Sequence, residues 1–117
     1  MISAKGHQTH HLIAEREIDL MKSGAFVVNI ARGAIIKKTA ILNALREGRI
    51  AGAALDVLED EPLKTVEEAS TPHLIVTCHA AFYNVESKIE MRSTSARIAK
   101  AAMLGEPLEN VVNLKTT

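Results

Sequence analysis

Hydrophobic residues gather in three short runs along the chain, and each run ends in polar residues. The runs cover residues 25–30, where five of six residues are apolar, then 50–57 and 73–77. Runs of this length, without alternation of apolar and polar positions, are typical of strands covered on both faces, as in a parallel sheet. We therefore predict three parallel strands at these positions.

Between and after these runs, apolar residues recur at helical spacing. A short helix is predicted over 15–22, a second over 38–47, and a short turn of helix over 64–70. A long helix is predicted from the cap residue Asn84 to about Met103. This alternation of strands and helices predicts an α/β fold with a parallel sheet, flanking helices and a long carboxyl-terminal helix.

Glycines and charged residues mark the ends of the predicted helices. Gly24 and Gly48 follow the first two helices, where glycine is favoured as a carboxyl-terminal cap. The start of the second helix is weak, because Lys37 and Lys38 occupy positions that favour an acid or a hydroxyl group.

The length and composition of the chain limit the number of domains, the kinds of partner and the cellular compartment that we expect. A chain of 117 residues is one small domain or a piece of a larger one. Fourteen basic residues balance fourteen acidic residues, so charge gives no reason to expect a nucleic acid or an anionic membrane as partner. The single cysteine, Cys78, suits a reducing compartment, and no apolar run reaches membrane-spanning length or resembles a signal peptide. We therefore expect a cytoplasmic protein.

Each predicted strand leads into a chemically active side chain. Arg32 follows the first strand, Asp56 lies at the end of the second, Glu61 is in the loop beyond it, and His79 follows the third. The carboxyl ends of parallel strands lie along one edge of a sheet, so these side chains can share one cleft. A carboxylate orients a neighbouring imidazole and favours its protonated form, and an arginine binds the carboxylate of a small acid.

These residues lie in four motifs that resemble the D-isomer-specific 2-hydroxyacid dehydrogenase family. The order, spacing and strand context of the motifs agree, whereas any one alone would be weak. A narrower likeness, carried by His79–Tyr83 and Ile89–Arg92, is to the branch that contains the C-terminal-binding protein corepressors. The four motifs are Thr9-His10-His11-Leu12-Ile13 with Gly24-Ala25-Phe26-Val27-Val28-Asn29, then Ala31-Arg32-Gly33, then Gly52-Ala53-Ala54-Leu55-Asp56-Val57 with Glu59-Asp60-Glu61-Pro62, and His79-Ala80-Ala81.

The resemblance implies a partial Rossmann-like sheet and an NAD-dependent oxidoreductase that acts on the CH-OH group of small D-2-hydroxy acids. In that family Arg32 would bind the substrate carboxylate and carbonyl, His79 would donate the proton during hydride transfer, and Glu61 would keep His79 charged. The implied cofactor is NAD, and the residues implied to bind it are Asn29, Ile30, Ala31, Asp56 and Ala81.

The resemblance also implies that this chain is a fragment. Residues 1–117 correspond to the carboxyl-terminal portion of the NAD-binding domain, while a G-x-G-x-x-G motif and the substrate domain are absent from them. Two smaller departures are Lys37, in place of an acid that caps the following helix, and Cys78, in place of a proline before the histidine. We expect the isolated fragment to be inactive.

Two other functions remain open from the sequence. The same motifs would fit an NAD-responsive corepressor-like binding protein, or an inactive remnant that acts as a structural or oligomerisation unit. The first predicted strand would normally have a neighbour from the missing half, and an unpaired apolar edge recruits partners. We therefore expect a homo-oligomer or pairing with a missing half, through that edge or an exchanged carboxyl-terminal helix.

Two other groups of residues look like functional sites, but we interpret both as having no chemical role. Cys78 beside His79 suggests a nucleophile pair, but neighbours on a strand point to opposite faces, so we do not expect one. The close spacing of His7, His10 and His11 resembles that of metal ligands. They lie in a predicted loop without a cysteine or acid nearby in the sequence, so we expect no metal site.

Overall fold

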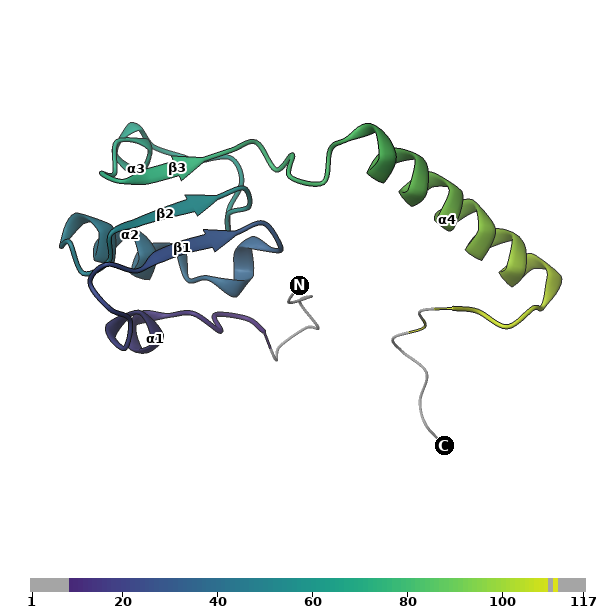
Figure 1. Cartoon of the computed structure of the whole chain (residues 1–117), viewed down its shortest axis with the longest axis horizontal. Coiled ribbons are helices and arrows are strands. Elements are labelled where there is room, and N and C mark those ends of the chain that lie inside the picture. The colour runs from purple at the N-terminus through teal and green to yellow at the C-terminus, as the bar shows by residue number, and fades with distance from the viewer. Residues whose placement is uncertain (1–8, 110, 112–117) are drawn as a thin grey trace. The chain divides into compact units, whose positions relative to one another are not determined.

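The computed structural model describes residues 9–109 and 111. The chain forms two compact units, Met1–Ala81 and Phe82–Thr117. The first unit holds a parallel sheet, and the second holds the long helix (Figure 1).

Three parallel strands form the described sheet, as the apolar runs predict. They are β1 (Phe26–Asn29), β2 (Gly52–Leu55) and β3 (Leu74–Val76), in the order β1-β2-β3. Each strand is shorter than its apolar run at both ends, although Asp56 and Thr77, just after β2 and β3, still donate their backbone N–H to the neighbouring strand. The register places Val28 opposite Ala54 and Ala54 opposite Ile75.

The helices agree with the predicted pattern, with two differences. The first unit contains α1 (Glu15–Asp19), the 3-10 helix η2 (Gly33–Ile35), α2 (Lys38–Arg46) and α3 (Val66–Ala69). The sequence predicts α1 as far as residue 22, but the helix ends at the cap Leu20, which is 78% exposed, and only Ile18 of α1 is buried. Beyond the helix end, Met21 still packs against the core although it is no longer helical, and η2 was not predicted.

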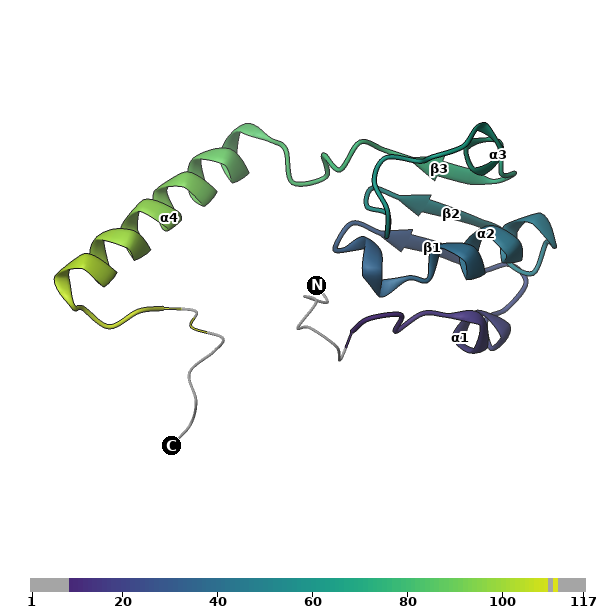
Figure 2. The same cartoon turned by 180° about the vertical axis from the view of Figure 1, so that it is seen from behind.

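Among the described residues, the hydrophobic core lies on one face of the sheet. Val27, Ala53 and Leu55 point from the strands toward α2, which lies across this face (Figure 2). The prediction that β1 is covered on both faces is wrong for the described residues, since Phe26 and Val28 are 75% and 67% exposed. We call the uncovered side the outer face, and its exposed apolar residues are Phe26, Val28, Ile30 and Ile75.

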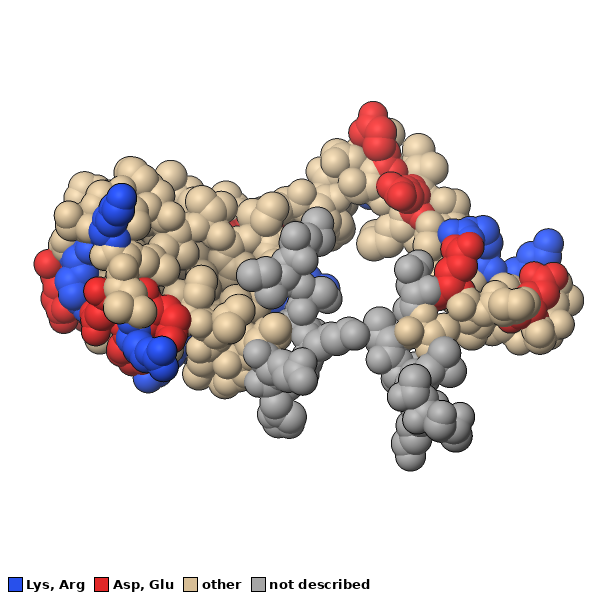
Figure 3. Space-filling view, turned by 60° about the horizontal axis from the view of Figure 1, so that its bottom comes forward, with Lys and Arg blue, Asp and Glu red and all other residues tan. Residues whose placement is uncertain are grey.

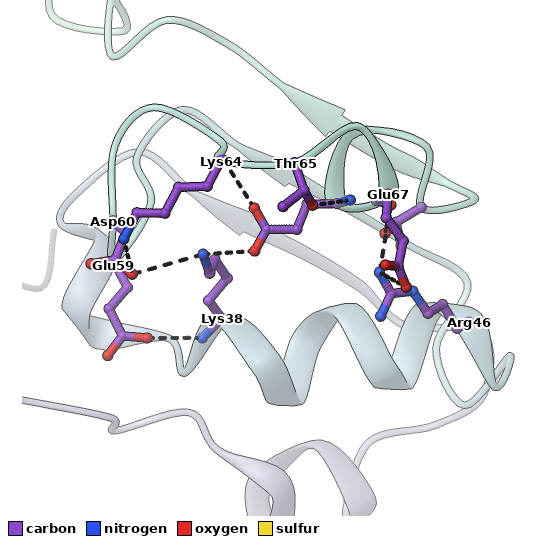
Figure 4. A network of polar contacts seen from close by, with 9 residues as sticks. Lys38, Arg46, Glu59, Asp60, Lys64, Thr65 and Glu67 are labelled. Carbon is purple, nitrogen blue, oxygen red and sulfur yellow. Dashed lines mark hydrogen bonds and ion pairs between the residues drawn. The ribbon is translucent and has the colours of Figure 1, made fainter.

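A carboxylate from a distant loop caps the weak start of α2. Oε2 of Glu59 accepts a hydrogen bond from the backbone N–H of Lys38 at 3.2 Å. The Lys38 side chain, only 11% exposed, pairs with Glu68 at 2.8 Å and with Asp60 at 3.8 Å (Figure 4). Glu68 also accepts a hydrogen bond from the N–H of Lys64. These contacts link three parts of the first unit: α2, α3 and the loop that follows β2.

We predict that Lys38→Met destabilises the first unit by about 1–2 kcal/mol, because it leaves half-buried Glu68 without its cationic partner. The matched control is Lys64→Met, whose ion pair to Asp60 is 3.3 Å long but 63% exposed on the lysine side. An exposed pair of this kind contributes under about 1 kcal/mol. Urea unfolding of both variants measures the difference, and equal losses would contradict a special role for Lys38.

The second unit consists mainly of α4 (Val85–Leu104). The predicted cap is confirmed, because Oδ1 of Asn84 accepts from the N–H of Ser87 at 2.7 Å, and Gly105 ends the helix in the left-handed conformation. Within the described residues of this unit, α4 has no buried side chain. No helix in the described ranges has both the length and the apolar character needed to cross a membrane.

Charged side chains of both signs are mixed over the surface rather than separated. In Figure 3, Lys and Arg lie among Asp and Glu at one end of the first unit, and most of the other surface of that unit seen in this view is uncharged. Charges of opposite sign also pair locally, since Arg49 forms ion pairs with both Asp19 and Glu47.

Candidate functional site

The carboxyl ends of the three strands converge on Asp56. This residue is only 7% exposed, and its backbone N–H donates to the carbonyl of Asn29 at 2.9 Å. Its Oδ1 accepts from Thr77 Oγ1 at 2.5 Å and from the N–H of Ala80 at 3.0 Å, while its Oδ2 accepts from the N–H of Ala81 at 2.9 Å. Asp56 therefore joins the ends of all three strands through its backbone and its carboxylate.

His79 and Glu61 form a pair at the same edge, as the motifs predict. Nδ1 of His79 lies 2.9 Å from Oε2 of Glu61, and Oε1 of Glu61 accepts from the N–H of Leu58 at 2.9 Å. The hydrogen bond from His79, then that from Leu58, lower the pKa of Glu61 below its ordinary value of 4.5 despite some desolvation. Since an ionised carboxylate only accepts hydrogen bonds, Nδ1 carries the shared hydrogen.

The pKa of Asp56 is lowered from its ordinary value of 3.8, first by the Thr77 hydroxyl and then by the Ala81 N–H, against an opposing effect of burial. A carboxyl group with a lowered folded pKa stabilises the fold above its ordinary pKa. That stability is lost as the pH falls through the folded value.

We therefore expect the first unit to have a lower urea midpoint at about pH 3 than at about pH 7, because Asp56 and Glu61 take up protons more readily in the unfolded chain. Asp56→Asn should remove part of this pH dependence, whereas Glu67→Gln, at a residue whose side chain is 85% exposed, should keep it. An unchanged midpoint in wild type over this range would contradict the roles given to both carboxylates.

Arg32 is not brought into contact with His79 in the described structure. Its side chain is exposed, and Nη1 donates to the carbonyl of Ala31 at 2.7 Å. The buried Asn29 shapes this turn, since Nδ2 donates to the Arg32 carbonyl at 2.9 Å and Oδ1 accepts from the Ala31 N–H at 3.1 Å. Asn29 thus holds the segment that presents Arg32 at the carboxyl end of β1.

Gly33 explains how the Arg32 turn meets the loop that carries Glu61. A Cβ atom at Gly33 would lie 1.8 Å from the carbonyl oxygen of Leu58 and 2.5 Å from the backbone nitrogen of Glu59. These atoms belong to the backbone and cannot rotate away. Glycine is therefore required by close contact between the two loops.

Asp56 and Thr77 both line two hollows that open at this edge. The hollow on the outer face has a volume of about 290 Å³ and is lined by Val28, Ile30 and Ala81 among others. The second, of about 430 Å³, contains Glu61 and His79. We call them the outer hollow and the His79 hollow; Arg32 lines neither of these two.

Of the residues predicted to bind cofactor, Ile30, Asp56 and Ala81 line the outer hollow. Asn29 and Ala31 do not line it; their polar atoms form the turn described above.

Cys78 and His79 do not lie on a strand, so the expectation that strand alternation separates them is wrong. β3 ends at Val76, both residues lie in the loop that follows, and His79 has a φ of 56°. Both also line the His79 hollow. Cys78 is a free, exposed cysteine.

An acid from far along the chain approaches the histidines of the amino-terminal loop, a contact that the local sequence does not predict. Nε2 of His11 lies 2.5 Å from Oε1 of Glu59, and the rings of His10 and His11 are 3.8 Å apart. The donor atoms of these three residues lie within 4.8 Å of one another, while His7 lies outside the described residues. Because both Glu59 oxygens already accept hydrogen bonds, from His11 and from the N–H of Lys38, we interpret the cluster as a structural link.

Sequence reasoning missed Thr77. A threonine at a strand end is unremarkable by itself, and only the fold shows that it meets a carboxylate 21 residues earlier in the chain. The one feature of the sequence that pointed to Thr77 is its position two residues before His79. At that position its side chain can reach the end of the adjacent strand β2.

Comparisons with known proteins agree with this geometry. The family described as "D-isomer specific 2-hydroxyacid dehydrogenase, NAD binding domain" matches residues 1–81. A glyoxylate reductase of Aeropyrum pernix is 41% identical over 107 residues, which cover 91% of this chain and 32% of that protein.

Solved structures give the same result and confirm the partial Rossmann-like sheet. A glyoxylate reductase from Paecilomyes thermophila is similar with a TM-score of 0.85 and 34% identity over 96% of this chain and 34% of that one. An NAD-complexed D-isomer specific 2-hydroxyacid dehydrogenase from Lactobacillus delbrueckii ssp. bulgaricus has a TM-score of 0.75 and 28% identity over 97% and 38% of the two chains. The chain thus spans about a third of the length of these proteins.

Proposed function

Since this chain belongs to the D-isomer specific 2-hydroxyacid dehydrogenase family, whose cofactor is NAD, we propose that it supplies the acid–base part of an oxidoreductase for small 2-hydroxy and 2-keto acids. The observation that carries this proposal is the His79–Glu61 pair, 2.9 Å apart beside the buried Asp56. A proton donor next to the carboxyl ends of parallel strands is placed where ligands of open α/β sheets bind.

His79 is assigned to proton transfer at Nε2. Glu61 accepts the hydrogen bond from Nδ1, which fixes the tautomer and the orientation of the ring. In the direction of reduction, Nε2–H would give its proton to the carbonyl oxygen of a 2-keto acid as hydride reaches the carbonyl carbon. In the reverse direction the neutral Nε2 would take the proton of the 2-hydroxyl group.

Arg32 is assigned to the substrate carboxylate. Its exposed guanidinium stands in the loop after β1, at the same sheet edge as His79, and a guanidinium binds a carboxylate through two parallel hydrogen bonds. Its present contact, to the carbonyl of Ala31, is a local one that a substrate could replace.

The outer hollow fits the nicotinamide end of NAD, which supplies or accepts the hydride when bound. Its lining includes the apolar side chains of Ile30 and Ala81 together with Asp56. The three hydrogen bonds accepted by Asp56 leave one of roughly four carboxylate lone-pair positions, on Oδ2, for a carboxamide N–H. Asn29 and Ala31 contribute by shaping the adjoining turn.

We further propose that residues 1–117 are the carboxyl-terminal portion of an NAD-binding domain and work with a segment that carries the phosphate-binding turn. The exposed apolar outer face and the free edge of β1 within the described sheet support this proposal. The same surfaces would support a homo-oligomer of the isolated chain. A cytoplasmic location is part of the proposal and is based on the single cysteine.

A chimera tests the proposed function. This chain would replace the 107 matching residues of the Aeropyrum pernix glyoxylate reductase, and NADH consumption would be followed with 2-keto acids and with acetone, which lacks the carboxylate. We expect turnover of the keto acids and negligible turnover of acetone. A folded chimera that binds NADH but reduces no 2-keto acid would contradict the proposal.

A further inference from the structure

The segment that carries His79 is fastened on both sides of the histidine. Thr77 precedes it and donates through Oγ1 to Asp56, while the amides of Ala80 and Ala81 follow it and donate to the same carboxylate. Thr77 is also held by its backbone, because its N–H donates to the carbonyl of Leu55 at 3.1 Å. His79 thus lies at the centre of a loop closed by one side chain.

This closure matters because His79 is in a conformation that non-glycine residues rarely adopt. Its φ of 56° lies in the left-handed region, which persists only where surrounding contacts fix it. The two amides alone hold only the part of the loop after His79. The Thr77 hydroxyl is the side-chain contact that fixes the part before it.

We propose that Thr77 is a positioning residue for His79: its hydroxyl, acting through Asp56, holds segment 77–81 so that Nδ1 of His79 meets Glu61. The proposal deepens the proposed function, on which it rests for the role of His79 in proton transfer. Thr77 lines both hollows at this edge, so the Thr77–Asp56 bond lies where the proposed cofactor and substrate regions adjoin.

Substitution of Thr77 by valine and by serine separates the effect of the hydroxyl group from the effect of side-chain shape. Thr77→Val keeps nearly the same volume but removes the hydrogen bond to Asp56, whereas Thr77→Ser keeps the hydroxyl and loses a methyl group. A role in packing alone predicts that serine is the worse replacement. A positioning role predicts that serine rescues and valine does not.

The test is an NMR titration of the Glu61 carboxyl carbon in the 117-residue chain. The Thr77 hydroxyl bonds to Asp56 rather than to Glu61, whose carboxylate is paired with His79. We expect the pKa of Glu61 to rise toward 4.5 in Thr77→Val, because His79 no longer stays within hydrogen-bond distance, and to stay at the wild-type value in Thr77→Ser. An identical Glu61 titration in wild type and Thr77→Val would overturn the proposal.

A second measurement uses wild type alone, in case Thr77→Val does not fold. The amide signals of Ala80, Ala81 and His79 should shift together with the titration of Asp56, because that carboxylate holds the whole loop. A His79 amide that does not respond to Asp56 would overturn the proposal. Neither readout needs cofactor or turnover, so an inactive chimera would contradict the proposed function while leaving these results to decide the role of Thr77.

Discussion

A His79→Asn substitution is expected to lower kcat for reduction of 2-keto acids by the chimera about 10²–10⁴-fold, the usual contribution of a positioned general acid. Asparagine tolerates the left-handed backbone conformation of this position, so the loop should keep its shape. The amide cannot take up and release a proton near neutral pH. Glu61 would still have a hydrogen-bond donor within reach, which separates the loss of proton transfer from the loss of structure.

His73→Asn is the matched control for this experiment. His73 has a φ of 57°, almost the same as the 56° of His79, but it precedes β3 at the opposite end of the strand. The two substitutions therefore have similar backbone consequences. We expect His73→Asn to keep turnover within a few-fold of wild type, and equal losses in the two variants would contradict an acid–base role for His79.

A Gly33→Ala substitution is expected to disrupt the site by separating the two loops that meet at Gly33. The new Cβ would lie 1.8 Å from the Leu58 carbonyl oxygen and 2.0 Å from its carbon, and backbone atoms at such distances must move. Inserting a methyl group into a packed contact costs about 1–3 kcal/mol and occasionally more. For a unit of this size we expect a fall in Tm of at least about 5 °C.

The same displacement should reduce activity in the chimera, because Leu58 donates its N–H to Glu61. Gly24→Ala is the control, since a Cβ there would meet no atom within 4 Å. It should leave both Tm and turnover close to wild type. A Gly33→Ala protein as stable and active as Gly24→Ala would show that the contact between the loops is unimportant.

The sheet and the long helix could be predicted because their signals are local. Apolar runs without alternation located β1, β2 and β3, and the cap Asn84 located the start of α4. Because the carboxyl ends of parallel strands share one edge of a sheet, the sequence alone also placed Glu61 and His79 together.

The coverage of β1 was not predictable in the same way. Its run of apolar residues indicates that both faces are suited to burial, but a run cannot show which element supplies the cover. In the first unit α2 covers Val27, and Phe26 and Val28 are exposed. The sequence pattern therefore shows that both faces of β1 are suited to burial, whereas residues 9–81 cover only one of them.

Contacts between loops that are distant in the chain also could not be predicted from the sequence. The cap of α2 comes from Glu59, 21 residues after Lys38, so a local search for a cap finds only lysines. Gly33 looks like a flexible residue until Leu58 is placed against it, and Thr77 looks ordinary until Asp56 is within 2.5 Å. Each of these depends on how the loops pack at the carboxyl edge.

The most direct test of the central proposal is the transfer of deuterium from NADH labelled at the nicotinamide C4 to glyoxylate by the chimera. If His79 and Glu61 form the acid–base pair of a 2-hydroxyacid dehydrogenase, the product is glycolate that carries one deuterium at C2, and His79→Asn suppresses its formation. A folded chimera that binds NADH and glyoxylate but transfers no deuterium, under conditions in which the parent reductase does, would contradict this assignment.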